Sequence, residues 1–275
     1  MFLDLEKVPG QNIAVISDDG EQITYDELTD FSLGIGRCLM FILCENTVES
    51  LLGYVYCLNN RVVPLLLDSK IDRVLLLNLI KTYSPQYIWL PKKANTFSYG
   101  VAFEYKNYVL LETQLTPFKL HDELALLLTT SGSTGSPKLV RQSYKNIFSN
   151  AEAIAEYLEI DQYEKPITSL PMNYTYGLSI INSHLLKGAA ILLTNKTLMQ
   201  REFWSFFMEE GATSIAGVPY TYEILKKLRF FKMSLPSLKT MTQAGGRLSP
   251  ELHREFAEYA RNTGRRFFVM YGATE

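Results

Sequence analysis

Short apolar runs alternate with helical segments along most of this 275-residue chain. In the first part, apolar runs at 41–43, 62–67 and 86–90 flank segments of helical period at 47–58 and 69–83. Crossover helices cover both faces of a parallel sheet, so this alternation predicts an α/β fold with mostly parallel sheets. From residue 123 the alternation continues, with strands expected at 124–129, 167–170, 189–193, 213–217, 239–243 and 266–270 and helices at 143–158, 177–187, 199–209, 219–230 and 250–262.

Local signals mark several element boundaries. Apolar runs at 13–17 and 22–24 flank a turn of the Asp-Gly type, which predicts a hairpin. Thr24 and Glu27 have capping-box spacing and predict a helix that runs to about Met40. Asp68 or Ser69 is expected to cap the next helix, and Ser249 with Pro250 marks the start of the last one.

Residues 94–120 interrupt the alternation with short, irregular runs of Tyr and Phe. We expect this segment to form hairpin strands or a linker. It divides the chain into a first α/β subdomain at 1–120 and a second at 121–275.

Composition excludes several functional classes. A formal net charge of −2 gives no electrostatic reason to expect nucleic acid as a partner. No apolar run is long enough to span a membrane, and the first residues lack the pattern of a signal peptide. Cys38, Cys44 and Cys57 are odd in number and lie in apolar surroundings, which favours reduced thiols and a cytoplasmic location.

The stretch Thr129 to Lys138 places six hydroxyls, two glycines and one lysine between an expected strand and an expected helix. Glycines let consecutive backbone N–H groups converge on one anion, and a lysine adds a charge that suits phosphate. The stretch therefore predicts a polyphosphate cradle, against the alternative of a flexible surface loop. The phosphate loop of common nucleotidases does not fit, because Gly135 is followed by Ser136 and Pro137 rather than by Lys.

Three more stretches, 170–178, 243–249 and 269–275, fall where strands should end, the edge at which open α/β sheets bind ligands. Together and in this order, the motifs resemble the adenylate-forming superfamily of acyl-CoA synthetases, aryl-CoA ligases and adenylation domains of peptide synthetases. Thr130 to Lys138 is similar to its phosphate-loop signature, and Tyr271 to Glu275 is similar to its Tyr-Gly-x-Thr-Glu signature. Residues 23–28 and 217–219 give supporting matches, so the resemblance covers nearly the whole chain.

The resemblance implies carboxylate adenylation: an acid and ATP give an acyl-adenylate and pyrophosphate. Mg²⁺ assists, and coenzyme A or the phosphopantetheine of an acyl-carrier protein then takes the acyl group. A small carboxylic acid is the implied substrate. The implied nucleotide site comprises Thr130, Ser131, Gly132, Ser133, Thr134, Gly135, Lys138, Gly245, Gly246, Tyr271, Gly272 and Thr274, with Lys138, Thr274 and Glu275 as catalytic residues, Glu275 as metal ligand, and Asn173, Tyr174, Gly177 and Val218 in the substrate pocket.

The sequence also departs from the family pattern. Leu139, Asn173, Tyr174 and Val269 stand where members often have Gly, Phe, His and Asn or Gln. The family's fold continues beyond the last motif into a barrel and a mobile C-terminal domain. We therefore expect an N-terminal portion that is inactive alone.

Two further questions concern substrate and class. Amino-acid-selective members usually carry an Asp in the stretch equivalent to 170–178. This stretch has no acidic residue, so an uncharged acyl tail, fatty, small aliphatic or aryl, is expected. The alternatives are an ATP- or AMP-binding module without catalysis, and an unrelated α/β transferase that the ordered motifs do not favour.

Overall fold

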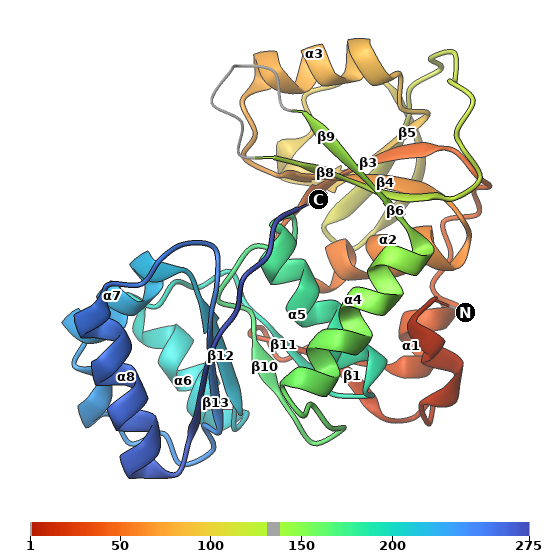
Figure 1. Ribbon diagram of the computed structural model, residues 1–275. Helices are drawn as coiled ribbons and strands as arrows, with labels where there is room; N and C mark the ends of the chain where they lie inside the picture. Colours follow the sequence, from red (N-terminus) through yellow and green to blue (C-terminus); the bar gives the residue numbers. More distant parts are fainter. Residues whose placement is uncertain (1, 131–137, 275) are drawn as a thin grey trace. The chain divides into compact units, whose positions relative to one another are not determined.

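The computed structural model describes residues 2–130 and 138–274, which form two compact units. Unit 1 comprises Met1–Gln11, Thr24–Asn150 and Thr274–Glu275, and unit 2 comprises Asn12–Ile23 and Ala151–Ala273. Each unit contains one seven-stranded sheet within the described residues (Figure 1). The sequence-based boundary at residue 120 differs from this division, because residues 124–143 pair with the first sheet.

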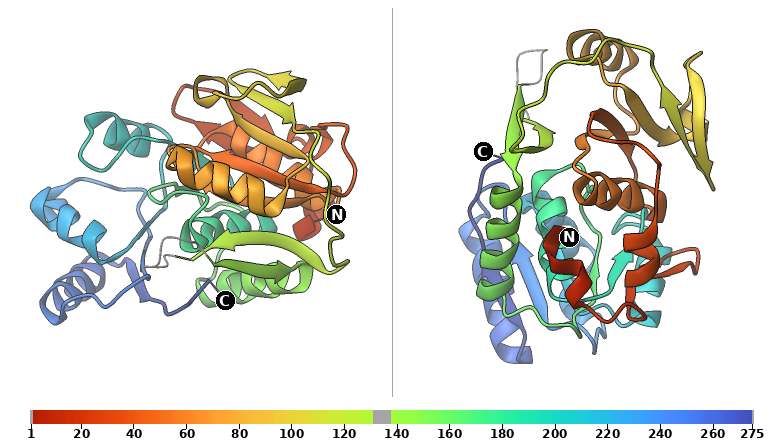
Figure 2. Two further views of the ribbon diagram at one scale, coloured as in Figure 1. Left: turned by 90° about the horizontal axis from the view of Figure 1, so that it is seen from above. Right: turned by 90° about the vertical axis from the view of Figure 1, so that its right-hand side faces the viewer.

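The sheet of unit 1 has the order β6-β7-β5-β3-β4-β8-β9. Its centre is parallel, whereas β7, β6 and β9 pair antiparallel at the edges (Figure 2). The elements of this unit are the 3-10 turns η1 (Phe2–Lys7) and η2 (Lys92–Ala94), helices α1 (Tyr25–Asp30), α2 (Val48–Asn59) and α3 (Arg73–Tyr83), and strands β3 (Leu39–Cys44), β4 (Val63–Asp68), β5 (Tyr87–Pro91), β6 (Gly100–Tyr105), β7 (Tyr108–Glu112), β8 (Leu124–Thr129) and β9 (Leu139–Ser143).

Helices cover both faces of this sheet, as Figure 1 shows for α2 and α3. Successive side chains of a strand point to opposite faces. Ile88 and Leu90 therefore join the core under α3, while Trp89 faces α2 and donates its indole N–H to the Glu49 carbonyl at 2.9 Å. Both sides of the central strands are buried, which explains their continuous apolar sequences.

The sheet of unit 2 has the order β14-β13-β12-β10-β11-β1-β2, and β14 through β1 pair in parallel. Helices α6, α7 and α8 bury one face, and α5 packs on the other. The elements are β1 (Ile13–Ser17), β2 (Gln22–Thr24), β10 (Pro166–Ile167), α5 (Thr175–Leu186), β11 (Ile191–Leu193), α6 (Arg201–Glu209), β12 (Ser214–Gly217), α7 (Pro219–Lys227), η3 (Phe230–Lys232), β13 (Thr240–Gln243), α8 (Pro250–Thr263) and β14 (Arg266–Val269); α4 (Tyr144–Tyr157) runs from unit 1 into unit 2.

The fold class expected from the sequence is confirmed, and three local expectations are wrong. The helix capped by Thr24 ends at Asp30 rather than near Met40, because the backbone becomes extended at Phe31 with a ψ of 130°. Further on, Gly34 adopts a left-handed φ of 68°, which a helix cannot contain. Asp72 caps α3, because Asp68 still belongs to β4. Strand β9 lies between the glycine-rich stretch and α4, where no strand was expected.

The expected hairpin in the irregular segment is present as β6 and β7. All three cysteines are free thiols, and burial raises the pKa of Cys38 to about 11. Within the described ranges, no helix is long and apolar enough to cross a bilayer.

Candidate nucleotide-binding site

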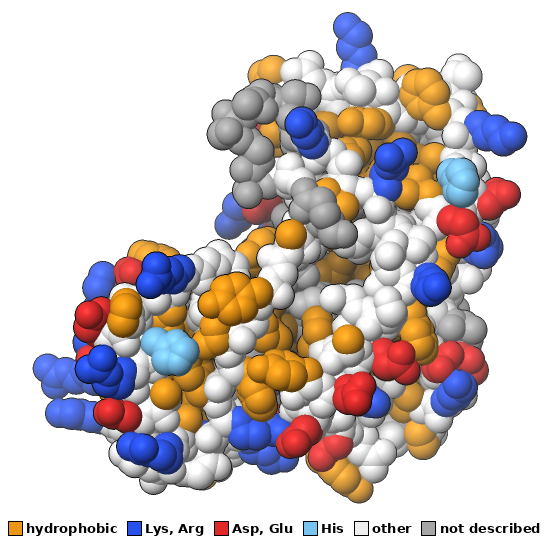
Figure 3. Space-filling view, viewed as in Figure 1, with side chains coloured by type: hydrophobic (Ala, Val, Ile, Leu, Met, Phe, Trp, Pro, Cys, Tyr) orange, Lys and Arg blue, Asp and Glu red, His pale blue; other side chains and the backbone are white. Residues whose placement is uncertain are grey.

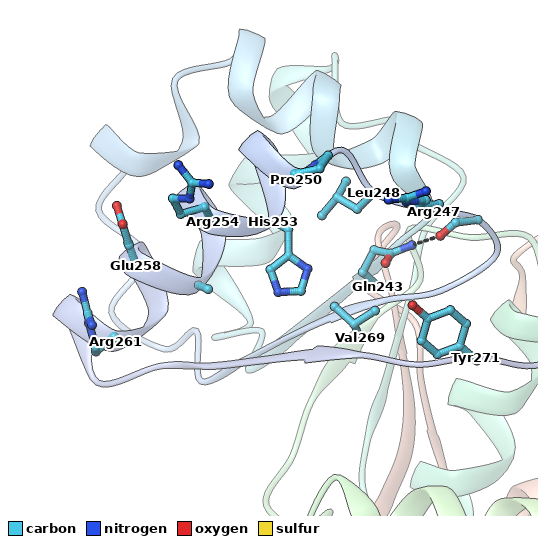
Figure 4. Close-up of a pocket in the computed structure, with 12 residues that line it drawn as sticks. Gln243, Arg247, Leu248, Pro250, His253, Arg254, Glu258, Arg261, Val269 and Tyr271 are labelled. Atoms are coloured by element: carbon cyan, nitrogen blue, oxygen red, sulfur yellow. Dashed lines mark hydrogen bonds between the residues drawn. The ribbon is translucent and has the colours of Figure 1, made fainter.

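A pocket of about 610 Å³ lies in unit 2 at the carboxyl ends of strands β13 and β14. Parallel strands of an α/β sheet place ligands at this edge. Figure 4 shows the pocket between α8 and the segment that continues β14. Its lining residues are Gln243, Gly246, Arg247, Leu248, Pro250, His253, Arg254, Ala257, Glu258, Arg261, Val269 and Tyr271.

One side of the pocket is a single stripe of α8. Pro250, His253, Ala257 and Arg261 recur at helical spacing along it, whereas Phe256 on the opposite stripe is buried in the core. Ser249 begins this helix as N-cap, as the sequence predicted, and its hydroxyl accepts the Leu252 N–H at 3.3 Å.

The chemical character of the pocket changes along its length. In Figure 4 the ring of His253 points into it, Tyr271 lies at one end and Arg261 at the other. Tyr271 is 90% exposed, which leaves a large aromatic face free to stack on a ligand. Three arginines, Arg247, Arg254 and Arg261, and one glutamate, Glu258, line the pocket, a net positive balance that suits an anionic ligand. Figure 3 shows Lys and Arg mixed with Asp and Glu over this part of unit 2.

The glycine pair after β13 forms the turn beside this pocket. Gly245 and Gly246 have φ values of 76° and 157°, which disfavour residues with a side chain. A Cβ on Gly246 would lie 3.1 Å from Cγ of Pro219. The side-chain amide of Gln243 fixes the turn by donating to the carbonyl oxygens of Gly246 at 2.8 Å and Ala244 at 3.1 Å.

Gly245 faces a second, apolar environment. A Cβ there would lie 2.5 Å from Oη of Tyr174 and 3.0 Å from Cγ1 of Val218, so these three expected site residues lie together. They pack on a cluster that includes Tyr176. The Tyr176 hydroxyl donates to Oγ1 of Thr242 at 2.7 Å, and burial raises the pKa of Tyr176.

The remaining residues of the expected substrate pocket precede or begin α5. Gly177 packs against the backbone: a Cβ there would meet the Pro171 carbonyl oxygen. Asn173 is half-buried and adjoins Tyr174 in the turn before the helix. Gly272 follows Tyr271 in an exposed segment, and a Cβ there would meet no atom within 4 Å.

The ends of the glycine-rich stretch lie in unit 1. Strand β8 ends at Thr129 and β9 begins at Leu139, and these two residues pair in an antiparallel ladder. The Thr130 N–H donates to the Lys138 carbonyl at 3.2 Å, and the Lys138 side chain is exposed. The expected phosphate-binding residues Ser131, Gly132, Ser133, Thr134 and Gly135 lie outside the described residues.

Unit 1 also contains a contact between Thr274 of the last motif and the strand that follows the glycine-rich stretch. Gln142, four residues after Lys138 on β9, donates its side-chain N–H to the Thr274 carbonyl at 2.9 Å. Thr274 is thereby held beside the strand that leaves the glycine-rich stretch. The expected metal ligand Glu275 lies outside the described residues, within which no three His, Cys, Asp or Glu side chains are grouped to hold a metal ion.

Sequence reasoning did not select several pocket residues. Gln243 carries the clearest missed signal, since a polar residue ends an expected buried strand immediately before a glycine pair. His253, Arg254 and Arg261 show no motif; only the helical spacing on α8 places them on one face.

The fold and this arrangement of motifs define the class of adenylate-forming enzymes. The chain has the architecture of the N-terminal portion of these enzymes. The family model of AMP-binding enzymes matches residues 4–275. The chain belongs to the AMP-binding enzyme family.

The relatives support this assignment. The chain is 27% identical over 232 residues to a 2-succinylbenzoate–CoA ligase of Escherichia coli, covering 84% of this chain and 47% of the ligase. It is 23% identical over 284 residues to a luciferin 4-monooxygenase of Nipponoluciola cruciata, covering 96% of this chain and 49% of that protein. The chain thus spans about half the length of these relatives.

A solved structure shows the same fold. The o-succinylbenzoate CoA synthetase of Bacillus subtilis, in complex with an acyl-adenylate intermediate, aligns with a TM-score of 0.78 and 21% identity. The alignment covers 100% of this chain and 58% of that one.

Proposed function

We propose that this chain binds ATP and that the protein activates a carboxylic acid as an acyl-adenylate. The observation that carries the proposal is the Gln142–Thr274 hydrogen bond, which holds Thr274 of the last motif against the strand that follows the glycine-rich stretch, although the two residues lie 132 positions apart. The exposed Lys138 lies four residues before Gln142 and directly precedes β9. Lys138 and Thr274 therefore both lie beside β9, where they would be available to one polyphosphate.

The chemistry needs positioning more than covalent help from the protein. A carboxylate oxygen attacks the α-phosphorus of ATP, the bond from that phosphorus to the β-phosphate bridging oxygen breaks, and pyrophosphate leaves. Two anions must approach each other, so preorganised N–H donors and positive charge lower the barrier. Thr130, the residues 131–135 and Lys138 would hold the β- and γ-phosphates, and Thr274 would contact the α-phosphate.

Mg²⁺ would neutralise charge on the phosphates, with Glu275 as its protein ligand. A thiol, from coenzyme A or from the phosphopantetheine of an acyl-carrier protein, would then displace AMP from the acyl group. The free, largely buried cysteines suit a reducing, cytoplasmic setting.

We further propose an acid with an uncharged tail. The cluster around Tyr174, Val218 and Gly245 is built from Leu170, Tyr176, Ile180, Ala216, Ala244 and Met270, none of which carries a charge. An ammonium group buried there would lack a partner at high cost. A fatty, small aliphatic or aryl acid would carry such a tail.

Two measurements on the chain test the proposal. Mg-ATP titrated by isothermal calorimetry should bind, and acid-dependent ATP–pyrophosphate exchange over a panel of fatty, aliphatic, aryl and amino acids should reveal the substrate in the longest available gene product. ATP binding without exchange in that product would identify the alternative, a nucleotide-binding module. Absence of any nucleotide binding would contradict the proposal.

A further inference from the structure

The segment that follows β14 is held by a single side chain. Its last backbone hydrogen bond joins the Met270 N–H to the Gln243 carbonyl oxygen at 2.8 Å. Beyond this bond, residues 271–274 form no helix or strand, and 271–273 are exposed. Within residues 2–130 and 138–274, the one hydrogen bond that 271–274 make is the one that the Gln142 side-chain N–H donates to the Thr274 carbonyl oxygen at 2.9 Å. The position of Thr274 therefore depends on Gln142.

Gln142 can serve as an anchor because its own backbone is fixed. It lies on the edge strand β9 and pairs in register with Leu126 of β8, which is completely buried. The Gln142 side chain is half-buried, and among the described residues it hydrogen-bonds to Thr274 alone. A paired strand thus carries a side chain whose single task in the described structure is to hold the last motif.

Lys138 lies on the same side of this strand as Gln142. Successive side chains of an extended strand point to opposite faces, so residues four positions apart share one face. The extended pairing reaches back to Lys138, whose carbonyl oxygen accepts the Thr130 N–H at 3.2 Å. Gln142 therefore brings Thr274 to the face of the hairpin that carries Lys138.

We propose that Gln142 is a positioning residue that sets Thr274 against the α-phosphate of the bound nucleotide. This inference rests on the proposed function, which assigns Thr274 to that phosphate. Because Gln142 binds the carbonyl oxygen of Thr274, the Thr274 hydroxyl is left to donate to a phosphate oxygen. A group that is held in place before the ligand arrives loses less conformational freedom on binding, so Gln142 raises the affinity for nucleotides that contain an α-phosphate.

The first test uses three ligands that differ in their phosphates: ATP, AMP and adenosine. Gln142→Met keeps the length of the side chain and removes the donor. Calorimetric titration of the whole chain should give affinities for ATP and for AMP that are each about five- to tenfold lower than in the wild type, the effect of one hydrogen bond. Adenosine has no phosphate and should bind both proteins within about twofold. Gln162→Met, the same substitution at an exposed position, is the matched control and should bind all three ligands like the wild type.

A cycle of two substitutions shows whether Gln142 acts through Thr274. Thr274→Val removes the hydroxyl and keeps the carbonyl group that Gln142 holds. If the hydroxyl carries the effect, adding Gln142→Met to Thr274→Val should lower the affinity for ATP and AMP by less than about twofold more. Contributions that are independent of each other would instead multiply.

A measurement without nucleotide tests the anchor itself. Tyr271 is 90% exposed, so chymotrypsin can cleave after it and release residues 272–275. Cleavage of a segment that opens transiently follows the population of its open form. Release, followed by mass spectrometry, should be about fivefold faster in Gln142→Met than in the wild type. Gln142→Asn keeps the amide but shortens its reach by one methylene, and it should give the same results if Gln142→Met does not fold.

The outcomes separate this inference from the proposed function. Equal losses for ATP, AMP and adenosine, full additivity in the cycle or unchanged cleavage would each overturn the positioning role of Gln142 and leave ATP binding intact. Failure of the wild-type chain to bind ATP or AMP would overturn the proposed function and this inference with it.

Discussion

Lys138 is the exposed cation at the base of the β8–β9 hairpin, and its backbone is held by Thr130. If it contacts the β- or γ-phosphate, its loss removes a charge-assisted hydrogen bond. Lys138→Ala should lower ATP affinity by about tenfold or more, in line with the 1.5–3 kcal/mol typical of hydrogen bonds to charged groups. Calorimetric titration measures this, and AMP, which lacks these phosphates, should be affected far less.

The matched control for Lys138 is Lys145→Ala, which removes an exposed lysine from α4. Its ATP affinity should equal that of the wild type. Equal losses in both variants would show that general positive charge, rather than Lys138, attracts the nucleotide.

Gly245 combines a left-handed φ of 76° with a close approach to Tyr174. Gly245→Ala should destabilise the protein through both effects, by about 1–2 kcal/mol from the backbone and about 1–3 kcal/mol from crowding. Gly264→Ala, at a φ of 69° with open space around it, carries the backbone cost alone. Urea unfolding should therefore give a lower free energy of unfolding for Gly245→Ala than for Gly264→Ala.

A second substitution tests the cause of the crowding. The nearest atom to the new methyl group is Oη of Tyr174, whereas Cζ lies 3.7 Å away. Tyr174→Phe should then recover most of the extra loss when combined with Gly245→Ala. No recovery would place the strain elsewhere, in the contact with Val218.

At the scale of elements, α8 links stability to the pocket, because one stripe of it faces the core and another lines the pocket. Ser249 caps its first turn through the Leu252 N–H. Ser249→Ala should lower the free energy of unfolding by about 1 kcal/mol, measured by urea denaturation. Ser249→Asp retains a capping acceptor and should stay within a few tenths of a kcal/mol of the wild type; an equal loss in both variants would mean that the cap is not the cause.

The sequence predicted most elements but misplaced some boundaries, for physical reasons. Apolar runs such as Leu39–Cys44 and Leu124–Thr129 are buried on both faces and leave little choice of structure. The helix α1 ends early because the backbone becomes extended at Phe31, with a ψ of 130°, and no glycine or proline at that position signals the change. Strand β9 lies at the edge of its sheet and its side chains are only half-buried, so its sequence has no continuous apolar run. Its pairing with β8 is what makes it a strand.

At the scale of the molecule, His184 couples the stability of unit 2 to pH. It is buried on α5, and its Nδ1 lies 2.8 Å from the Ile180 carbonyl oxygen. Burial lowers the pKa of His184 to about 4. It lines a small cavity of about 20 Å³ together with Glu164 and Arg266.

The direction of the pH effect follows from this lowered pKa. In the unfolded chain the ring takes up a proton near pH 6.5, whereas in the folded chain it stays neutral to about pH 4. The stabilising contribution is therefore complete above about pH 6.5 and is lost as the pH falls towards 4, by up to about 3 kcal/mol. In urea unfolding at several pH values, the free energy of unfolding should fall less steeply with decreasing pH for His184→Gln than for the wild type.

The control is His253→Gln, which removes an exposed histidine from α8. Its unfolding free energy should follow the wild-type pH dependence between pH 6.5 and 4. If His184→Gln and the wild type decline in parallel, other groups carry the acid sensitivity.

The sequence by itself determined the α/β class, most strands and helices, and the motifs that assign the family, because each of these depends on local pattern: burial period, capping residues and glycine spacing. Only the tertiary structure decided which distant segments meet. The pairing of Val15 with Ile191, the contact of Gln142 with Thr274 and the position of Gln243 beside Val269 all join segments that are far apart in the chain. Strand order and side-chain direction set those contacts, and neither is encoded in the local pattern of any one segment.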